Sequence, residues 1–298
     1  MVVRFLANLF LLFLPVASAA QSLTNISKIC FARGGFVYVM DMKTKQTKRI
    51  VKGSDPNISP DGKQIAYTFS ANSTTPNRIV KVIDLETNKE RDFKGLAKFI
   101  HYGAIWSPDG KWLAVNVFKE VGQKYNWEVA IVNPENGEWR FLTDTISHDG
   151  AYLSSWTANS RSIVCHDLNF IYEIDLNGKI VRRLTVGDVT KDNSISSASR
   201  FVFSPDGKML LFDSDLPDEV GGLFVYNIED KTLRRVTPKT VSAAEPMWLP
   251  SEKEILFSGR QVGRGRQIPQ KLFKISLTGN TLEAIITNAD QGSFAVEK

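Results

Sequence analysis

Short apolar runs separated by polar turns recur along most of the chain. The clearest turn is Ser-Pro-Asp-Gly-Lys, which occupies residues 59–63, 107–111 and 204–208, and residues 157–161 and 249–253 fit the same frame. The copies begin at residues 59, 107, 157, 204 and 249, so the unit recurs every 45 to 50 residues. A period of this size indicates a solenoid, a propeller or another array of repeated units.

Each turn joins two apolar runs, and this arrangement predicts a β-hairpin. Proline presets the first central position of a tight turn, and Asp-Gly supplies residues that tolerate a positive φ. A third and a fourth strand-like run with a second polar turn between them complete each unit, as in residues 127–132 and 139–143. Four short strands in every unit are the signature of propeller blades.

The units can be counted from the same pattern. Five complete units run from about residue 54 to residue 287, and a sixth is split between the ends of the chain. Residues 29–33, 36–41 and 47–51 supply its second, third and fourth strands, and residues 293–296 supply the missing innermost strand. This closure hides an otherwise free sheet edge. The predicted fold is therefore all-β, a six-bladed propeller of four-stranded antiparallel blades closed by the C-terminal strand.

Residues 1–19 carry the pattern of a secretory signal peptide: a basic start at Arg4, an apolar run, and small residues before Ala19. A membrane anchor is the alternative, but the apolar run of about a dozen residues is shorter than the roughly 20 that a bilayer requires. We therefore expect cleavage after Ala19 or Ala20, which leaves one propeller domain over residues 20–298 in the periplasm or outside the cell. No second apolar run is long enough to cross a membrane.

Charge and cysteine content add two expectations. The formal net charge of +5 is mild and the charges are scattered, so a nucleic-acid partner is not expected. Cys30 and Cys165 could form a disulfide in an exported protein. They lie about three units apart, however, on opposite sides of a six-unit ring, and a disulfide requires Cα atoms within about 7 Å. We expect two buried free thiols in a monomer without a cofactor.

The repeat resembles a known family. The Ser-Pro-Asp-Gly-Lys frame, preceded by Trp106 or Phe203 and followed by runs such as residues 65–67, resembles the WD40-like β-propeller repeat of the TolB family over nearly all of residues 20–298. TolB itself looks like a small α/β domain ahead of a six-bladed propeller, whereas only residues 21–29 precede the first strand here. The resemblance therefore implies a TolB-like propeller without that domain, and periplasmic protein–protein binding. Proteins resembling oligogalacturonate lyases and peptidase propellers carry the same repeat, so function stays open.

The candidate site lies where the innermost strands begin, because these strands line the central channel of a propeller. Each inner strand ends in an apolar core residue, usually aromatic, and these packing residues repeat from blade to blade. The residue three positions before each of them changes from blade to blade. A varied, charged ring at a channel mouth is suited to holding a ligand or a partner's peptide. A solvated channel with internal ion pairs is the alternative. The predicted binding residues are Asp55, His101, Tyr102, His148, Arg200 and Glu245.

Other chemistry-bearing residues are interpreted as structural. The turn residues Asp61, Asp109 and Asp206 are expected to cap local backbone N–H groups, and the recurring tryptophans to pack between blades. Arg260 and its glycine-rich surroundings can be a basic finger or a solvated hairpin loop, and the hairpin is favoured. Gly-x-Ser-x-Gly is absent from the sequence, so a serine hydrolase is not indicated.

The functional hypothesis is an exported, non-enzymatic propeller that binds an envelope protein or peptide at the channel mouth. The alternative is a metal-assisted polysaccharide lyase or hydrolase of the oligogalacturonate-lyase type. It would use His148 with a divalent metal and Arg200 against a substrate carboxylate. The sequence contains no closely spaced histidine pair to support the metal.

Overall fold

The computed structural model describes residues 23, 25–71, 78–121, 124–144, 146, 150–191, 194–216, 219–262 and 268–297. The predicted signal peptide over residues 1–19 lies outside this part of the chain, so its cleavage stays a prediction. Among the described residues, no helix has the length and apolar character required to cross a membrane.

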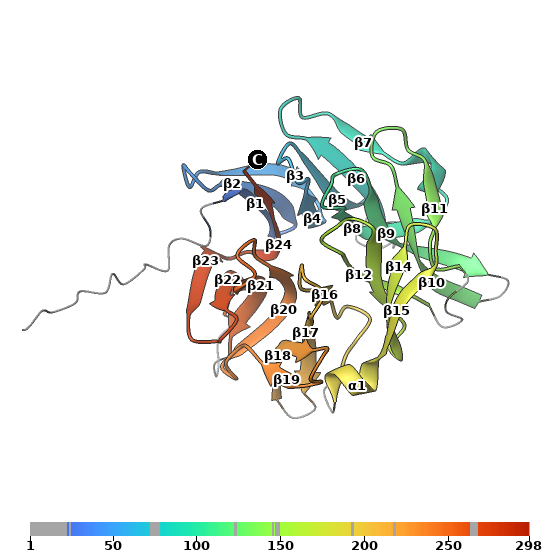
Figure 1. The fold of residues 1–298 in the computed structure, drawn as a ribbon. Helices are drawn as coiled ribbons and strands as arrows, with labels where there is room; N and C mark the ends of the chain where they lie inside the picture. The colour runs from blue at the N-terminus through green and yellow to red at the C-terminus, as the bar shows by residue number, and fades with distance from the viewer. Residues whose placement is uncertain are drawn as a thin grey trace, which may run out of the picture.

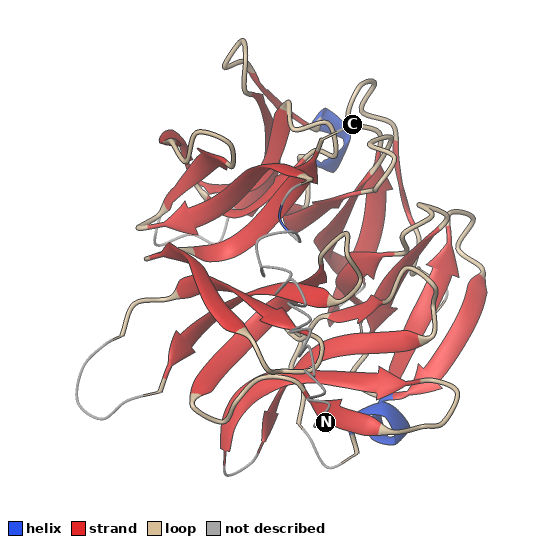
Figure 2. Ribbon diagram, turned by 60° about the vertical axis from the view of Figure 1, so that its left-hand side comes forward, coloured by secondary structure: helices blue, strands red, loops and turns tan. Residues whose placement is uncertain are grey.

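Six four-stranded antiparallel sheets surround a central axis, as the sequence predicts (Figure 1). From the innermost strand outward, the blades are β24 (Asp290–Val296), β1 (Ile26–Arg33), β2 (Phe36–Asp41) and β3 (Thr47–Lys52); β4 (Ser54–Ile58), β5 (Gln64–Ser70), β6 (Arg78–Asp84) and β7 (Glu90–Asp92); β8 (Ile100–Trp106), β9 (Leu113–Val121), β10 (Lys124–Val132) and β11 (Trp139–Phe141); β12 (Tyr152–Trp156), β13 (Ser162–His166), β14 (Phe170–Asp175) and β15 (Ile180–Thr185); β16 (Phe201–Phe203), β17 (Met209–Leu216), β18 (Glu219–Asn227) and β19 (Leu233–Arg235); and β20 (Val241–Trp248), β21 (Glu254–Gln261), β22 (Lys271–Ser276) and β23 (Leu282–Thr287). Among the described residues, the helical elements of more than one residue are two single turns, η2 (Lys94–Leu96) and α1 (Val186–Thr190). Figure 2 shows strands dominating the described chain.

The C-terminal strand closes the ring. β24 pairs antiparallel with β1, with Phe294 opposite Ile29 and Ser293 opposite Cys30. The Ser293 hydroxyl lies 3.0 Å from the Cys30 sulfur and accepts a hydrogen bond of 2.9 Å from the backbone N–H of Ile58 in the next blade. The tail therefore completes the first blade and also contacts its neighbour, which confirms the predicted closure.

The repeated turn obtains its shape from hydrogen bonds between its own residues. In the first copy, the Ser59 hydroxyl donates to the Asp61 carboxylate at 2.6 Å, and the backbone N–H of Lys63 donates to the same oxygen at 3.1 Å. The third central residue, Gly62, has a φ of +69°, a conformation that glycine adopts without strain. The copies beginning at Ser107 and Ser204 make the same hydroxyl–carboxylate bond. The interpretation of these aspartates as structural is therefore confirmed.

The core consists of apolar clusters formed largely between neighbouring blades. Trp156 donates its indole N–H to the backbone carbonyl of Ile105 in the preceding blade at 2.9 Å, and Trp248 donates to the carbonyl of Val202 at 3.1 Å. The tryptophans pack between blades, as predicted. Both cysteines are buried free thiols, which confirms the expectation of no disulfide.

Candidate functional site

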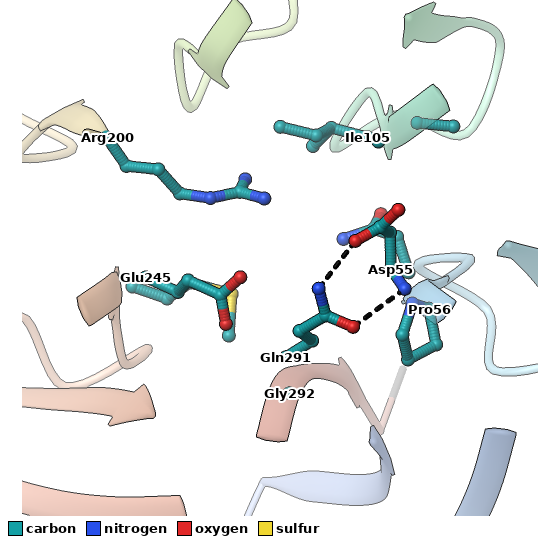
Figure 3. A pocket seen from close by; sticks show the side chains of 11 residues that line it. Asp55, Pro56, Ile105, Arg200, Glu245, Gln291 and Gly292 are labelled. Atoms are coloured by element: carbon teal, nitrogen blue, oxygen red, sulfur yellow. Dashed lines mark hydrogen bonds between the residues drawn. The ribbon is translucent and has the colours of Figure 1, made fainter. Parts of the chain in front are cut away.

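The starts of the inner strands gather around a small polar cavity on the channel axis (Figure 3). Its volume of about 30 Å³ is room for roughly two water molecules. Three predicted residues, Asp55, Arg200 and Glu245, line it together. The polar residue Gln291 also lines the cavity and was missed by the sequence analysis.

Gln291 has the same position relative to the end of its inner strand as the other predicted residues. It stands three residues before Phe294, as Asp55 stands three before Ile58 and Glu245 three before Trp248. The same offset thus holds in the C-terminal strand as well as in the complete units. The signal for Gln291 was therefore present in the sequence.

The backbone at this ring is left-handed in four inner strands. Asp55, Glu245 and Gln291 have φ values of 50°, 55° and 51°, and Gly103 has a φ of 64°. The inner strands β4, β8 and β20 each contain a register shift at this point, which is the mark of a β-bulge. Bulges re-aim side chains, and strained backbone is concentrated at functional sites. Figure 3 shows the Asp55, Glu245 and Gln291 side chains around the cavity.

Asp55 on β4 and Gln291 on β24 are joined by two hydrogen bonds, which form a clasp between the second blade and the C-terminal strand of the first blade. The Gln291 amide donates to the Asp55 carboxylate at 2.5 Å, and the Asp55 backbone N–H donates to the Gln291 amide oxygen at 2.9 Å. Because both ends of the Gln291 amide are engaged, this side chain is a fixed part of the ring. The clasp also orients one carboxylate at the cavity edge.

A second hydrogen-bonded path leads from Gln291 to Glu245. The backbone N–H of Gln291 donates to the Ser258 hydroxyl at 2.9 Å, and that hydroxyl donates to one Glu245 carboxylate oxygen at 2.9 Å. Burial raises the pKa of Glu245, the Arg200 charge opposes this rise, and the charge of Asp290 adds to it. The Glu245 carboxylate is thus held in place, and Arg200 and Ser258 offset only part of the cost of burying its charge.

Arg200 supplies the positive charge of the ring. Its backbone N–H donates to the buried carboxylate of Asp213 at 2.7 Å, which fixes the start of β16. Its side chain extends toward the cavity (Figure 3), and the guanidinium makes no hydrogen bond or ion pair with the described part of the chain. Burial raises the pKa of Asp213 to about 7, although the Arg200 N–H and charge oppose that shift.

Tyr102 lies near the ring but is not among the residues that line the cavity. Its ring is covered by the Arg78 guanidinium, 3.8 Å from the ring centroid, and meets Trp127 edge-to-face at 5.3 Å. Burial raises the pKa of Tyr102, and Asp55 and Tyr152 contribute in the same direction. Tyr102 therefore belongs to an adjacent aromatic–cationic cluster at the same end of the channel.

His101 is buried in the packing between the second and third blades. It is 1% exposed, and its Nδ1 atom accepts a hydrogen bond of 3.0 Å from the backbone N–H of Val80. Burial lowers the pKa of His101 to about 4, so the ring is neutral at physiological pH. The structure does not bring His101 to the cavity, and His148 lies outside the described residues. His101 and Tyr102 are adjacent in sequence, and successive strand residues point to opposite faces.

The contact of His101 leads to a stability prediction. His101→Leu removes the acceptor for the buried Val80 N–H, and we expect the free energy of unfolding to fall by about 1–3 kcal/mol. Chemical denaturation at pH 7 measures this loss. The control is Lys98→Leu at an exposed neighbouring position, where a change within about 0.5 kcal/mol is expected. Equal stabilities of His101→Leu and the wild type would contradict the structural role assigned to the ring.

The described residues do not bring three histidine, cysteine or acidic side chains together as a metal-binding group. The other described histidine, His166, is fully buried with its Nε2 atom 3.1 Å from the backbone carbonyl of Ser199. A metal site would therefore depend on His148 and Asp149, which are outside this part of the chain.

A larger basin opens where the inner strands end, and the sequence analysis did not foresee it. It has a volume of about 530 Å³ and is lined mainly by apolar residues that follow the repeat, including Trp106, Trp156, Trp248 and Phe294. The turn prolines, such as Pro108, also line it. The two ends of the channel thus differ: repeated packing residues form this basin, whereas blade-specific polar residues form the mouth.

The fold and the mouth define a six-bladed propeller with a polar channel entrance, and known structures share this fold. No family model and no curated protein matches the sequence. TolB from Acinetobacter baumannii is similar with a TM-score of 0.63 and 18% identity, over 90% of this chain and 66% of that chain. A putative TolB from Agrobacterium tumefaciens gives a TM-score of 0.61 and 17% identity, over 92% of this chain and 98% of that chain. Kuenenia stuttgartiensis hydrazine synthase gives a TM-score of 0.66 and 12% identity, over 92% of this chain and 47% of that chain.

These similarities establish a TolB-type propeller fold. Identities of 12–18% carry no information about the partner or the chemistry of this chain. The chain spans just under two thirds of the Acinetobacter protein, at 66% of its length.

Proposed function

We propose that this chain is an exported, non-enzymatic propeller that binds a protein or peptide partner at its channel mouth. The observation that carries the proposal is the contrast between the two kinds of inner-strand residue. The packing residues repeat in every blade, but the ring of Asp55, Arg200, Glu245 and Gln291 differs from blade to blade and lines one cavity. Variation confined to one surface of a rigid scaffold is typical of binding sites.

The geometry favours docking from outside over passage through the channel. A cavity of about 30 Å³ is too small for a polypeptide backbone, so a partner would rest on the mouth and insert one group at a time. The Arg200 guanidinium and one Glu245 oxygen are the groups of the ring that make no hydrogen bond within the described chain. They are available to a partner without breaking existing bonds.

Export and the nature of the partner are part of the same proposal. The signal-peptide pattern of residues 1–19 and the TolB-type fold support a periplasmic or secreted location. An envelope protein or peptide is then the partner class, and the chain acts as a monomer without nucleic acid. The lyase alternative retains one supporting feature, because the free Arg200 guanidinium could bind a substrate carboxylate. It also requires His148 and a metal, which metal analysis of the purified protein and a His148→Ala variant would test.

Capture from an envelope extract tests the binding surface. We expect the wild-type chain to retain a partner that the double variant Arg200→Ala, Glu245→Ala loses, because both unengaged groups of the mouth are removed. The control is Arg161→Ala, Glu297→Ala, which also removes one base and one acid, from exposed positions that line neither the mouth cavity nor the basin. Capture is measured by quantitative mass spectrometry of eluates. Identical protein profiles for the wild type and the mouth variant would reject the mouth as the binding face.

A further inference from the structure

We propose that the channel mouth takes a cationic side chain of its partner, a lysine or arginine, beside Glu245. This inference rests on the proposed function and names the partner's anchoring group. Asp55 and Glu245 line the cavity, and Asp213 and Asp290 lie close enough to act on Glu245 or Arg200. Arg200 is the one cationic lining residue in the described chain, so negative charge exceeds positive charge there.

The hydrogen bonds show which of these carboxylates is available. Asp55 is already engaged by the Gln291 amide and by the Ser54 hydroxyl at 3.2 Å. Asp213 accepts from the Arg200 backbone and is buried. Glu245 accepts one bond from Ser258, and its second oxygen has no hydrogen bond within the described residues. A new donor at the mouth would therefore find its acceptor at Glu245.

The arrangement fits an organic cation better than a metal ion. A metal requires several oxygen ligands at one point within about 2.0–2.6 Å. The described side chains form no such group, and Figure 3 shows Asp55 and Glu245 on different sides of the cavity. A guanidinium or ammonium group carries several donors on a flexible stem, and it can bond Glu245 while remaining partly hydrated.

Substitution of Arg200 distinguishes a cationic ligand from an anionic one. Its guanidinium carries the same charge as the proposed ligand and contacts no acid of the ring directly. Removing this charge should therefore strengthen the binding of a cation, whereas it would weaken the binding of an anion. A gain in affinity cannot result from misfolding of the variant.

The pH dependence follows from the same neighbours. The charged groups around Glu245 are Asp55 on β4, Arg200 before β16, Asp213 on β17 and Asp290 on β24. Burial raises the pKa of Glu245 although the Arg200 charge opposes this, so its ionised form is disfavoured in the free protein. A bound cation favours that form. We therefore expect affinity for a cation to increase as the pH rises from 5 to 8.

The test uses n-propylguanidinium as the probe, with n-butyrate and n-butyramide as anionic and neutral controls. Ligand-detected NMR titration of the full chain measures the dissociation constants. We expect n-propylguanidinium to bind, with about tenfold weaker affinity in Glu245→Gln and several-fold stronger affinity in Arg200→Gln. Neither control compound should bind comparably. Thermal unfolding verifies that both variants are folded.

The outcomes separate this inference from the proposed function. Absence of n-propylguanidinium binding, preferential binding of n-butyrate, or weaker cation binding in Arg200→Gln would each overturn the inference. Loss of partner capture in the mouth variant would still support the proposed function in all three cases. Conversely, cation binding that follows Glu245 and Arg200 as expected, without partner capture, would reject the proposed function alone.

Discussion

Deletion of residues 290–298 is expected to abolish cooperative folding. The deletion removes β24, which pairs with β1 along the inner edge of the first blade and donates the buried Ser293 and Ala295 to the ring. It would expose Ile29 and Cys30, which are fully buried, and leave the β1 edge unpaired. The loss would exceed about 5 kcal/mol, which is comparable to the whole stability of many domains. Circular dichroism melts and size-exclusion chromatography measure the effect.

A shorter truncation provides the matched control. Removing residues 297–298 takes away the exposed Glu297 and one backbone hydrogen bond of 2.7 Å from its N–H to the Asn25 carbonyl. A change of about 1 kcal/mol or less is expected from this truncation. If the longer deletion unfolded cooperatively at the wild-type temperature, the ring would not depend on the C-terminal strand.

The fold could be predicted because its determinants are local and repeated. Each Ser-Pro-Asp-Gly-Lys turn encodes its own geometry, since Ser59 and Asp61 bond within the turn, and the fixed period then sets the number of blades. The closure by residues 293–296 followed from counting strands. These features require no knowledge of contacts between distant side chains.

The site was only partly predictable, because a β-bulge changes the direction in which the side chain at a given sequence position points. The offset from the terminal core residue found Asp55, Arg200 and Glu245, and the same offset would have found Gln291. It did not reveal that His101 is buried against Val80, because strand neighbours alternate faces and the register of β8 shifts after Tyr102. The basin was not foreseen, because a residue that packs between blades can also present one edge to a cavity.

Asp213→Asn is expected to stabilise the protein at pH 8 by up to about 4 kcal/mol. Burial raises the folded-state pKa of Asp213 from 3.8 to about 7. The folded state therefore holds a proton that the unfolded state has lost, and the stability contribution of this residue decreases as the pH rises from about 4 to 7. Asparagine keeps an oxygen that can accept the Arg200 N–H without carrying the charge. The benefit should be largest above pH 7 and vanish near pH 4.

Urea denaturation of the wild type and of Asp213→Asn between pH 4 and pH 8 measures this difference. Asp230→Asn is the matched control, because the pKa of this exposed turn residue is lowered, chiefly by the Thr232 hydroxyl and its N–H. Asp230→Asn should therefore lower stability slightly at pH 8, whereas Asp213→Asn should raise it. A lower stability of Asp213→Asn at pH 8 would mean that attraction between Asp213 and Arg200 outweighs the burial of the carboxylate. A gain would show that the burial of this carboxylate costs more stability than its attraction to Arg200 returns.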